Sequence, residues 1–298
     1  MIRFGYACQL LENNKNVSCS HRLTYTKFKQ MDWEDAEKKL IEIGRKNLSN
    51  LLFILKYNYE HNIKLFRISS ALIPLATHPD MDWDYLNLLK DEFKQIKDYL
   101  SDKDMRIDMH PGHFVLLNSQ NPIVVERSKK DLEYHYNIMN AMGIDPKIVL
   151  HIGTFKPSKE EALKRFIDEF KKLPDRLKNM IMLENDDKTF TAFETYWLCK
   201  KLNIPMVFDV HHHRCNYDDF YLEWFFETWK NTNLNPKMHW SSPNAESKNY
   251  RAHSNDINIK EYKYLYDLLL NYDINIDIML ETKNKNLSIF KLLNKLKT

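Results

Sequence analysis

The chain has 298 residues, of which 43% are hydrophobic and 29% charged, and its formal net charge is +3 at pH 7. This balance is typical of a globular protein with a large core, and it excludes a polycation, so contact with nucleic acid would need positive charge gathered on one face. No Pro-, Gly- or Ser-rich stretch divides the sequence, and we predict a single domain over residues 1–298.

Cysteine and glycine usage narrows the class further. None of the four cysteines stands in a Cys-x-x-Cys pair, so neither a zinc finger nor a disulfide framework is indicated, and we expect a reducing, cytoplasmic compartment. The five glycines are scattered, whereas phosphate-binding loops need clustered glycines, so no nucleotide cofactor is expected. No apolar segment is of the signal-peptide or membrane kind, and we expect no membrane contact.

Short apolar segments alternate with longer amphipathic ones along the chain. The predicted strands cover residues 2–7, 64–69, 105–110, 147–152, 180–184, 205–210, 236–241 and 275–281. The predicted helices cover residues 36–61, 83–100, 124–142, 159–173, 192–202, 217–230, 260–272 and 287–297. Eight successive strand–helix units predict an α/β protein, a (β/α)8 TIM barrel.

Ionisable residues gather at the carboxyl ends of these strands. One such residue is usually a solvated loop residue, but five or more strands end in this way, with these residues: His110, His151, Glu184, Asp209, His239 and Glu281. A barrel brings those ends into one ring, where active sites of this fold lie. Imidazoles and carboxylates without thiolates are the ligand set of zinc, manganese or iron, so the sequence predicts a metal site there.

Two positions leave alternatives open. Lys237 lies two residues before His239, so both side chains point to the same side of a strand, either inside the barrel or at its lower rim, paired to a carboxylate. Alternation from Asp209 puts His211 inward and His212 outward, unless the strand has already ended, in which case either could reach a metal. His213, the next residue, is expected to be structural or to face solvent.

Together these residues resemble the UV damage endonucleases. The motifs occur in the family's order and span nearly the whole chain: Arg3-Phe4-Gly5-Tyr6, Pro74-Leu75-Ala76-Thr77-His78-Pro79, His110-Pro111-Gly112, His151-Ile152-Gly153, Leu183-Glu184-Asn185-Asp186-Asp187, Phe208-Asp209-Val210-His211-His212, Pro236-Lys237-Met238-His239, Arg251-Ala252-His253 and Glu281-Thr282-Lys283.

The resemblance implies a fold related to endonuclease IV and a cluster of up to three divalent ions, usually Mn²⁺. The implied partner is damaged double-stranded DNA, bound by a monomer that acts on the nucleoid. The implied reaction is incision on the 5′ side of cyclobutane pyrimidine dimers, 6-4 photoproducts and often abasic sites.

The resemblance also implies roles for particular residues. The implied metal ligands are His110, His151, Glu184, Asp209, His212, His239, His253 and Glu281. The implied catalytic residues are Glu184, Asp209, Lys237, which the family can carboxylate, and His78, near the phosphate. The implied DNA contacts are Tyr6, His113 and Phe114.

Two departures bear on lesion choice rather than on the metals. His113-Phe114 stands where the family tends to have Gln followed by Tyr or Phe, and Gln9-Leu10-Leu11 stands where an asparagine is frequent. Two other functions stay open: a metal-dependent sugar isomerase on the same kind of barrel, and a protein that binds damage without cutting.

Overall fold

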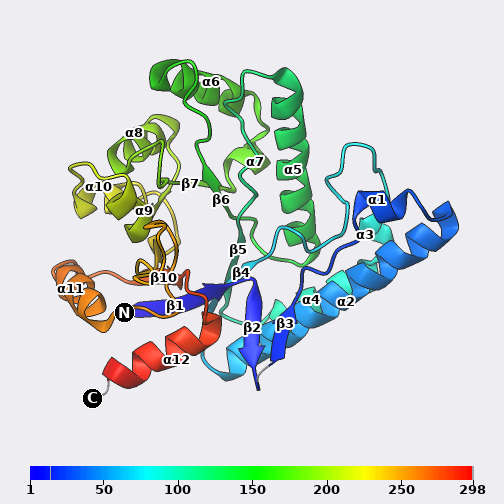
Figure 1. Ribbon diagram of the computed structural model, residues 1–298, viewed down its shortest axis with the longest axis horizontal. Helices are drawn as coiled ribbons and strands as arrows, with labels where there is room; N and C mark the ends of the chain where they lie inside the picture. Colours follow the sequence, from blue (N-terminus) through cyan, green and yellow to red (C-terminus); the bar gives the residue numbers. More distant parts are fainter. Residues whose placement is uncertain (14, 297–298) are drawn as a thin grey trace.

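The computed structural model describes residues 1–13 and 15–296, and eight parallel strands close into a barrel (Figure 1). Around the barrel they follow the order β1-β10-β9-β8-β7-β6-β5-β4. Their bounds are β1 Ile2–Ala7, β4 Leu65–Ile68, β5 Arg106–Met109, β6 Ile148–His151, β7 Ile181–Glu184, β8 Met206–Asp209, β9 Lys237–Trp240 and β10 Ile276–Leu280. The predicted barrel is confirmed, and each predicted strand lies in it.

Strand alternation separates an inner from an outer face. On β1, Tyr6 points outward and packs edge-on against Phe66 of β4, with ring centroids 5.1 Å apart. Gly5 points inward, where an added Cβ would lie only 2.3 Å from the carbonyl oxygen of Leu65. The close approach of β1 and β4 therefore requires glycine at this position.

Helices cover the outside of the barrel (Figure 1). Their bounds are α2 Trp33–Glu60, α4 Lys90–Leu100, α5 Pro122–Ala141, α6 Lys159–Lys172, α8 Ala192–Leu202, α10 Leu222–Glu227, α11 Ile259–Leu270 and α12 Lys285–Leu296. The predicted end of the last helix, residue 297, lies outside the described residues. Of the helices described, none is long and apolar enough to cross a membrane.

Two predicted helices differ from the structure. The segment 83–100 is broken at Leu89, whose fully buried side chain packs against Gly44 of α2, so that α3 (Tyr85–Leu88) precedes α4. The segment 217–230 is helical only in α10, and the Asp218 carboxylate before this helix accepts a hydrogen bond from the backbone N–H of Phe193, at the start of α8.

Several short elements were not predicted. An antiparallel hairpin, β2 (Gln9–Glu12) and β3 (Lys15–Ser18), follows β1. The short helices are α1 (Tyr25–Phe28), α7 (Asp175–Lys178) and α9 (Val210–Cys215). Of these, α9 bears most directly on the site, because it starts where β8 ends.

The backbone ladders of the barrel are unequal. Strands β1 and β10 are paired from Ile2 with Ile276 to Tyr6 with Leu280, whereas β5 and β6 are paired at Met109 and Ile148 alone among the described residues. The shortest ladder therefore joins the two strands that lead to His110 and His151.

Candidate metal centre

The ends of β5, β6 and β7 bring three side chains together. His110, His151 and Glu184 each offer a ligand atom, and these atoms lie within 4.8 Å of one another. The Nε2 atoms of His110 and His151 lie 2.9 and 3.4 Å from Oε2 of Glu184. Two imidazoles and one carboxylate in this arrangement could hold one divalent cation.

A second group surrounds the other oxygen of the same carboxylate. Glu184, Asp209, His239 and Glu281 offer ligand atoms that also lie within 4.8 Å of one another. Oε1 of Glu184 is bonded to Nδ1 of His239, while Oε2 faces His110. The Glu184 carboxylate therefore stands between two candidate metal positions and could bridge them.

The local turn after β8 decides between His211 and His212. The strand ends at Asp209, whose Oδ1 accepts a hydrogen bond from the backbone N–H of His212 at 2.7 Å and so caps α9. Strand alternation stops there, and the ring of His212 turns back toward the site, with Nδ1 3.8 Å from Oε1 of Glu184. His211 is fully buried instead, with its ring 5.4 Å from that of His253.

His253 comes from a loop rather than from a strand end. Its backbone forms an isolated bridge with Pro243, and its Nδ1 donates to the carbonyl oxygen of Glu281 at 2.8 Å. The rings of His253 and His212 are 6.5 Å apart. This second imidazole pair borders the two groups without belonging to either.

Burial and neighbouring charge shift the pKa values of the cluster in different directions. It lowers the pKa of His110 and of His151 to about 3, and raises the pKa of Asp209 to about 6. The pKa of Glu184 is also raised by burial. His212 behaves differently, because the carboxylates Asp209 and Glu184 outweigh its burial and raise its pKa to about 10.

Two buried atoms without hydrogen-bond partners also indicate that these residues could hold a divalent cation. Oδ2 of Asp209 and Nδ1 of His151 are buried and have no hydrogen-bond partner in the described protein. Burying such atoms unpaired costs free energy, and a bound cation could supply the missing partner, most directly to the Asp209 oxygen. The nitrogen and oxygen ligands match manganese, zinc or iron rather than a soft-thiolate metal.

Lys237 lies one layer deeper in the barrel, below His239. It is fully buried and is paired with the Asp108 carboxylate of β5, while burial lowers its pKa to about 8. Both readings of this lysine thus hold in part, since it is interior and also paired to a carboxylate.

Arg67, which the sequence analysis did not single out, holds two members of the second group from the inside. Its Nη1 donates to Oε1 of Glu281 at 2.6 Å, and its Nη2 lies 2.6 Å from Nε2 of His239. Against the effect of burial, the guanidinium holds the pKa of Glu281 well below its usual range. The available signal was a single charged residue inside the apolar strand β4.

Asn185 was also missed as an individual residue. Its fully buried side chain accepts from the backbone N–H of Asp209 at 2.9 Å and donates to the carbonyl oxygen of Asp209 at 3.0 Å. Its own carbonyl oxygen accepts from Nδ1 of His212 at 2.9 Å. Asn185 thus orients two candidate ligands, Asp209 at the end of β8 and His212 after it.

A groove of about 580 Å³ opens above the cluster, and it is called the metal groove below. It is lined by His113, His151, Lys188, His212, Arg251 and His253, among others. The ring of His113 stacks on that of His151 at 5.4 Å. Phe114, the next residue, is 68% exposed, so its ring projects from the protein surface.

His78 is not part of either metal group. It is half-buried on the loop after β4, where its ring stacks on Tyr25 with centroids 3.9 Å apart. It lines a different groove, about 860 Å³ in volume.

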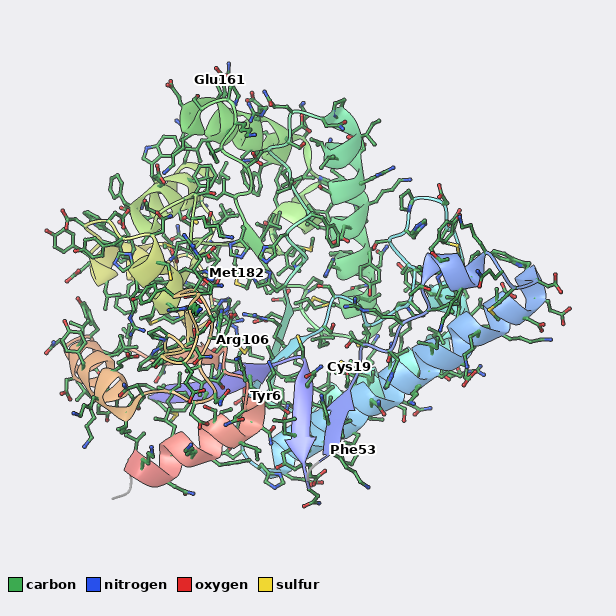
Figure 2. The ribbon with its side chains drawn as sticks, viewed as in Figure 1. Tyr6, Cys19, Phe53, Arg106, Glu161 and Met182 are labelled. Carbon is green, nitrogen blue, oxygen red and sulfur yellow. The ribbon has the colours of Figure 1, made fainter. Side chains whose placement is uncertain are left out.

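The expected DNA contact of Tyr6 is corrected by the structure. The side chain is fully buried on the outer face of β1, where its hydroxyl donates to Oδ1 of Asn58 on α2 at 2.7 Å (Figure 2). The alternation that places Gly5 inside the barrel necessarily places Tyr6 outside. Its ring therefore has no surface to offer to a duplex.

Comparisons with known proteins identify the family of this chain. The family described as UV-endonuclease UvdE matches residues 2–298. A UV DNA damage endonuclease of Bacillus cereus (strain B4264) is 39% identical over 302 residues, covering 99% of this chain and 95% of the relative. The crystal structure of SacUVDE matches with a TM-score of 0.88 and 32% identity, over 100% of this chain and 98% of the other.

Endonuclease IV from Thermus thermophilus shares the fold more distantly. Its TM-score is 0.57 at 12% identity, over 83% of this chain and 94% of the other. The whole-chain match and the identity to the Bacillus cereus relative show more than a common fold. The chain belongs to the UV-endonuclease UvdE family.

Proposed function

We propose that this DNA repair endonuclease hydrolyses the phosphodiester immediately 5′ to UV lesions, namely cyclobutane pyrimidine dimers and 6-4 photoproducts, and also cuts at abasic sites. One observation carries the proposal: a buried carboxylate, Glu184, stands between two groups of imidazole and carboxylate ligands beneath an open groove. Family membership favours this reading over a sugar isomerase on a similar barrel.

The reaction would depend on a cluster of up to three divalent ions, with Mn²⁺ as the proposed metal. His110, His151 and Glu184 would hold the first ion, and the second would lie among Glu184, Asp209, His239 and Glu281. His212 and His253 would hold the third ion. Bound ions supply an activated water and neutralise charge on the phosphate.

The protein's own groups would then orient that chemistry. Arg67 fixes Glu281 and His239 from inside the barrel, and Lys237 keeps a paired positive charge below them. Glu184, with one carboxylate oxygen toward His110 and the other toward His239, would be a ligand shared by the two groups. This division leaves the open side of the cluster to the scissile phosphate.

Lesion recognition would fall to His113 and Phe114. His113 covers the first ligand group by stacking on His151, and the exposed ring of Phe114 is an apolar wedge able to enter a base stack. Damaged bases stack poorly, so displacing them takes less free energy than displacing intact ones.

The test is incision of a UV-irradiated duplex oligonucleotide compared with the same duplex left unirradiated. We expect a nick on the 5′ side of the lesion with Mn²⁺, loss of nicking on chelation and recovery on adding Mn²⁺ back. Equal cutting of both duplexes would reject lesion specificity. A lesion-dependent gel shift without nicking would instead support a protein that binds damage without cutting.

A further inference from the structure

We propose that the groove between α5 and the loop after β4 binds the backbone of the complementary, undamaged strand of the duplex. The inference rests on the proposed function, since it assumes that the metal groove receives the damaged strand. It adds a second strand site, 860 Å³ in volume, which we call the α5 groove.

The α5 groove has two walls of different chemistry. The wall from α5 carries Pro122, Ile123, Glu126, Arg127 and Lys130, and the loop wall comprises residues 76–82. In Figure 1 this loop runs between α5 and α1. None of the candidate metal ligands lines the groove, so a strand lying in it would be out of reach of the chemistry.

Residues 111–123, called the divider below, join the metal groove to the α5 groove along the chain. Residues 111–116 line the metal groove along part of their length, and Pro122 and Ile123 line the α5 groove. Two apolar side chains stand out from this divider: Phe114 is 68% exposed and Ile123 is 60% exposed. An apolar divider between two grooves is the shape that would part the strands of an opened duplex.

Two cations on the α5 wall are suited to phosphate, and the carboxylate beside them, Glu126, is already paired with Lys129. Arg127 and Lys130 are exposed, lie three residues apart on one face of the helix, and make no ion pair with any described residue. Their neighbour Lys129, in contrast, is bonded to Glu126 at 2.7 Å and to Glu169 at 2.9 Å. The two unpaired cations are thus available to a backbone, whose affinity depends chiefly on such contacts.

The loop wall is suited to bases rather than to phosphate. His78 presents a ring already stacked on Tyr25, a platform on which a further ring could stack. Asp80 and Asp82 line the same wall, and carboxylates repel phosphate but accept hydrogen bonds from the amino groups of bases. The strand would therefore run with its phosphates on α5 and its bases toward the loop.

Buried hydrogen bonds hold the two walls and the metal centre in one frame. The Ser70 hydroxyl donates to the carbonyl oxygen of His110 at 2.6 Å and is bonded to Nε2 of His135 on α5 at 3.0 Å. Tyr134, also on α5, donates to the carbonyl oxygen of Ser70 and accepts from the backbone N–H of Ile73. The spacing between the α5 groove and the ligand His110 is therefore fixed by the fold.

The test is the binding of photoproduct duplexes that carry neutral methylphosphonates in place of phosphates. In one duplex they replace phosphates of the complementary strand opposite the lesion, and in the other they replace phosphates of the damaged strand beside it. The variant is R127E/K130E. The matched control is K260E/K263E, two exposed cations of the same spacing on α11, which follows β9 on the opposite side of the barrel from β5. Binding is measured by fluorescence anisotropy across a salt series, and folding by thermal unfolding.

We expect the variant to bind the unmodified duplex roughly tenfold or more weakly, with a salt slope smaller by about two. Methylphosphonates in the complementary strand should weaken duplex binding by the wild-type protein and by the control, but not by the variant. Methylphosphonates in the damaged strand should weaken duplex binding equally for the wild-type protein, the control and the variant.

The inference is overturned if the variant binds as tightly as the control. It is equally overturned if complementary-strand methylphosphonates weaken the variant as much as the wild-type protein. Because the readout is binding, it stands apart from the nicking assay, where wild-type protein that fails to cut would reject the proposed function itself.

Discussion

The two ends of the barrel treat buried charge in opposite ways. At the carboxyl end, Glu184 and Asp209 are buried with raised pKa values, and one oxygen of Asp209 has no hydrogen-bond partner among the described residues. At the amino end, Asp277 is fully buried too, yet Arg3 binds both of its oxygens and Arg106 donates to one at 2.8 Å. Against the effect of burial, these arginines lower its pKa.

The buried charges at the two ends of the barrel have different roles. Paired charge at the amino end stabilises the closed barrel, whereas the carboxyl end holds charge that the metal-free protein satisfies poorly. Without metal, the unsatisfied ligands at the carboxyl end lower the stability of the fold, and a bound cation should therefore raise that stability.

Replacing Glu184 by Gln tests the carboxyl end of the barrel and should have the largest effect. Incision should fall by about a thousandfold or more, because both proposed metal positions lose a shared ligand. The metal-free protein should become more stable at pH 7, because a carboxyl whose folded pKa is raised destabilises the fold once ionised. Nicking rates and chemical denaturation without metal measure the two effects. A variant that is less stable without metal would contradict the contrast.

Replacing Asp277 by Asn tests the amino end. Loss of this partner leaves Arg3 and Arg106 partly unpaired, so the free energy of unfolding should fall by about 3–5 kcal/mol at pH 7. Because the folded pKa is lowered, the carboxylate's contribution is present above the unfolded value of about 3.9 and is lost as the pH falls through the folded value.

Denaturation at several pH values should therefore show the wild-type and D277N stabilities converging below about pH 4. The control is D145N, an exposed carboxylate near the same end, which should change stability by about 0.5 kcal/mol or less. A D277N penalty that stayed constant down to low pH would show that the ion pairs are not its source.

Replacing Asn185 by Ala tests the support of the metal site without removing a proposed ligand. Loss of its hydrogen bonds to Asp209 and His212 should weaken Mn²⁺ binding by about 10- to 100-fold. Calorimetric titration with Mn²⁺ measures the change, and N231A, at an exposed asparagine, is the control. Unchanged affinity would mean that the ligands orient themselves without this amide.

Replacing Tyr6 by Phe should have the smallest effect. The lost hydrogen bond to Asn58 should lower stability by about 1 kcal/mol, and incision of lesions should be unchanged because the ring is buried away from the groove. Thermal unfolding and nicking rates test both points. Lesion-specific loss of incision with no loss of stability would restore Tyr6 as a DNA contact.

The sequence was sufficient for the barrel because its signals are local. Apolar segments of strand length alternate with amphipathic stretches, and ionisable residues follow the strands at one end. Closure of the barrel then brings His110, His151 and Glu184 together without any further information. The short elements escaped because hairpin β2–β3 and helix α9 carry too few residues to show a period.

The site was harder to predict where one residue's register decides its neighbours. The end of β8 at Asp209 reverses the direction expected for His211 and His212, and strand alternation alone does not say where a strand stops. Arg67 and Asn185 matter through contacts with residues far away in the chain, which no local pattern records. For Tyr6 the small inward residue Gly5 was the available clue.

The unequal ladders of the barrel have a consequence for its motions. Strands β5 and β6 share the shortest run of backbone pairing, and they are the strands that lead to His110 and His151. An ion bound by both imidazoles would link β5 to β6 where their backbone pairing is short. Without the ion, the amide hydrogens of β5 and β6 should exchange with solvent faster than those of β1 and β10. Binding of the ion should slow the exchange in β5 and β6.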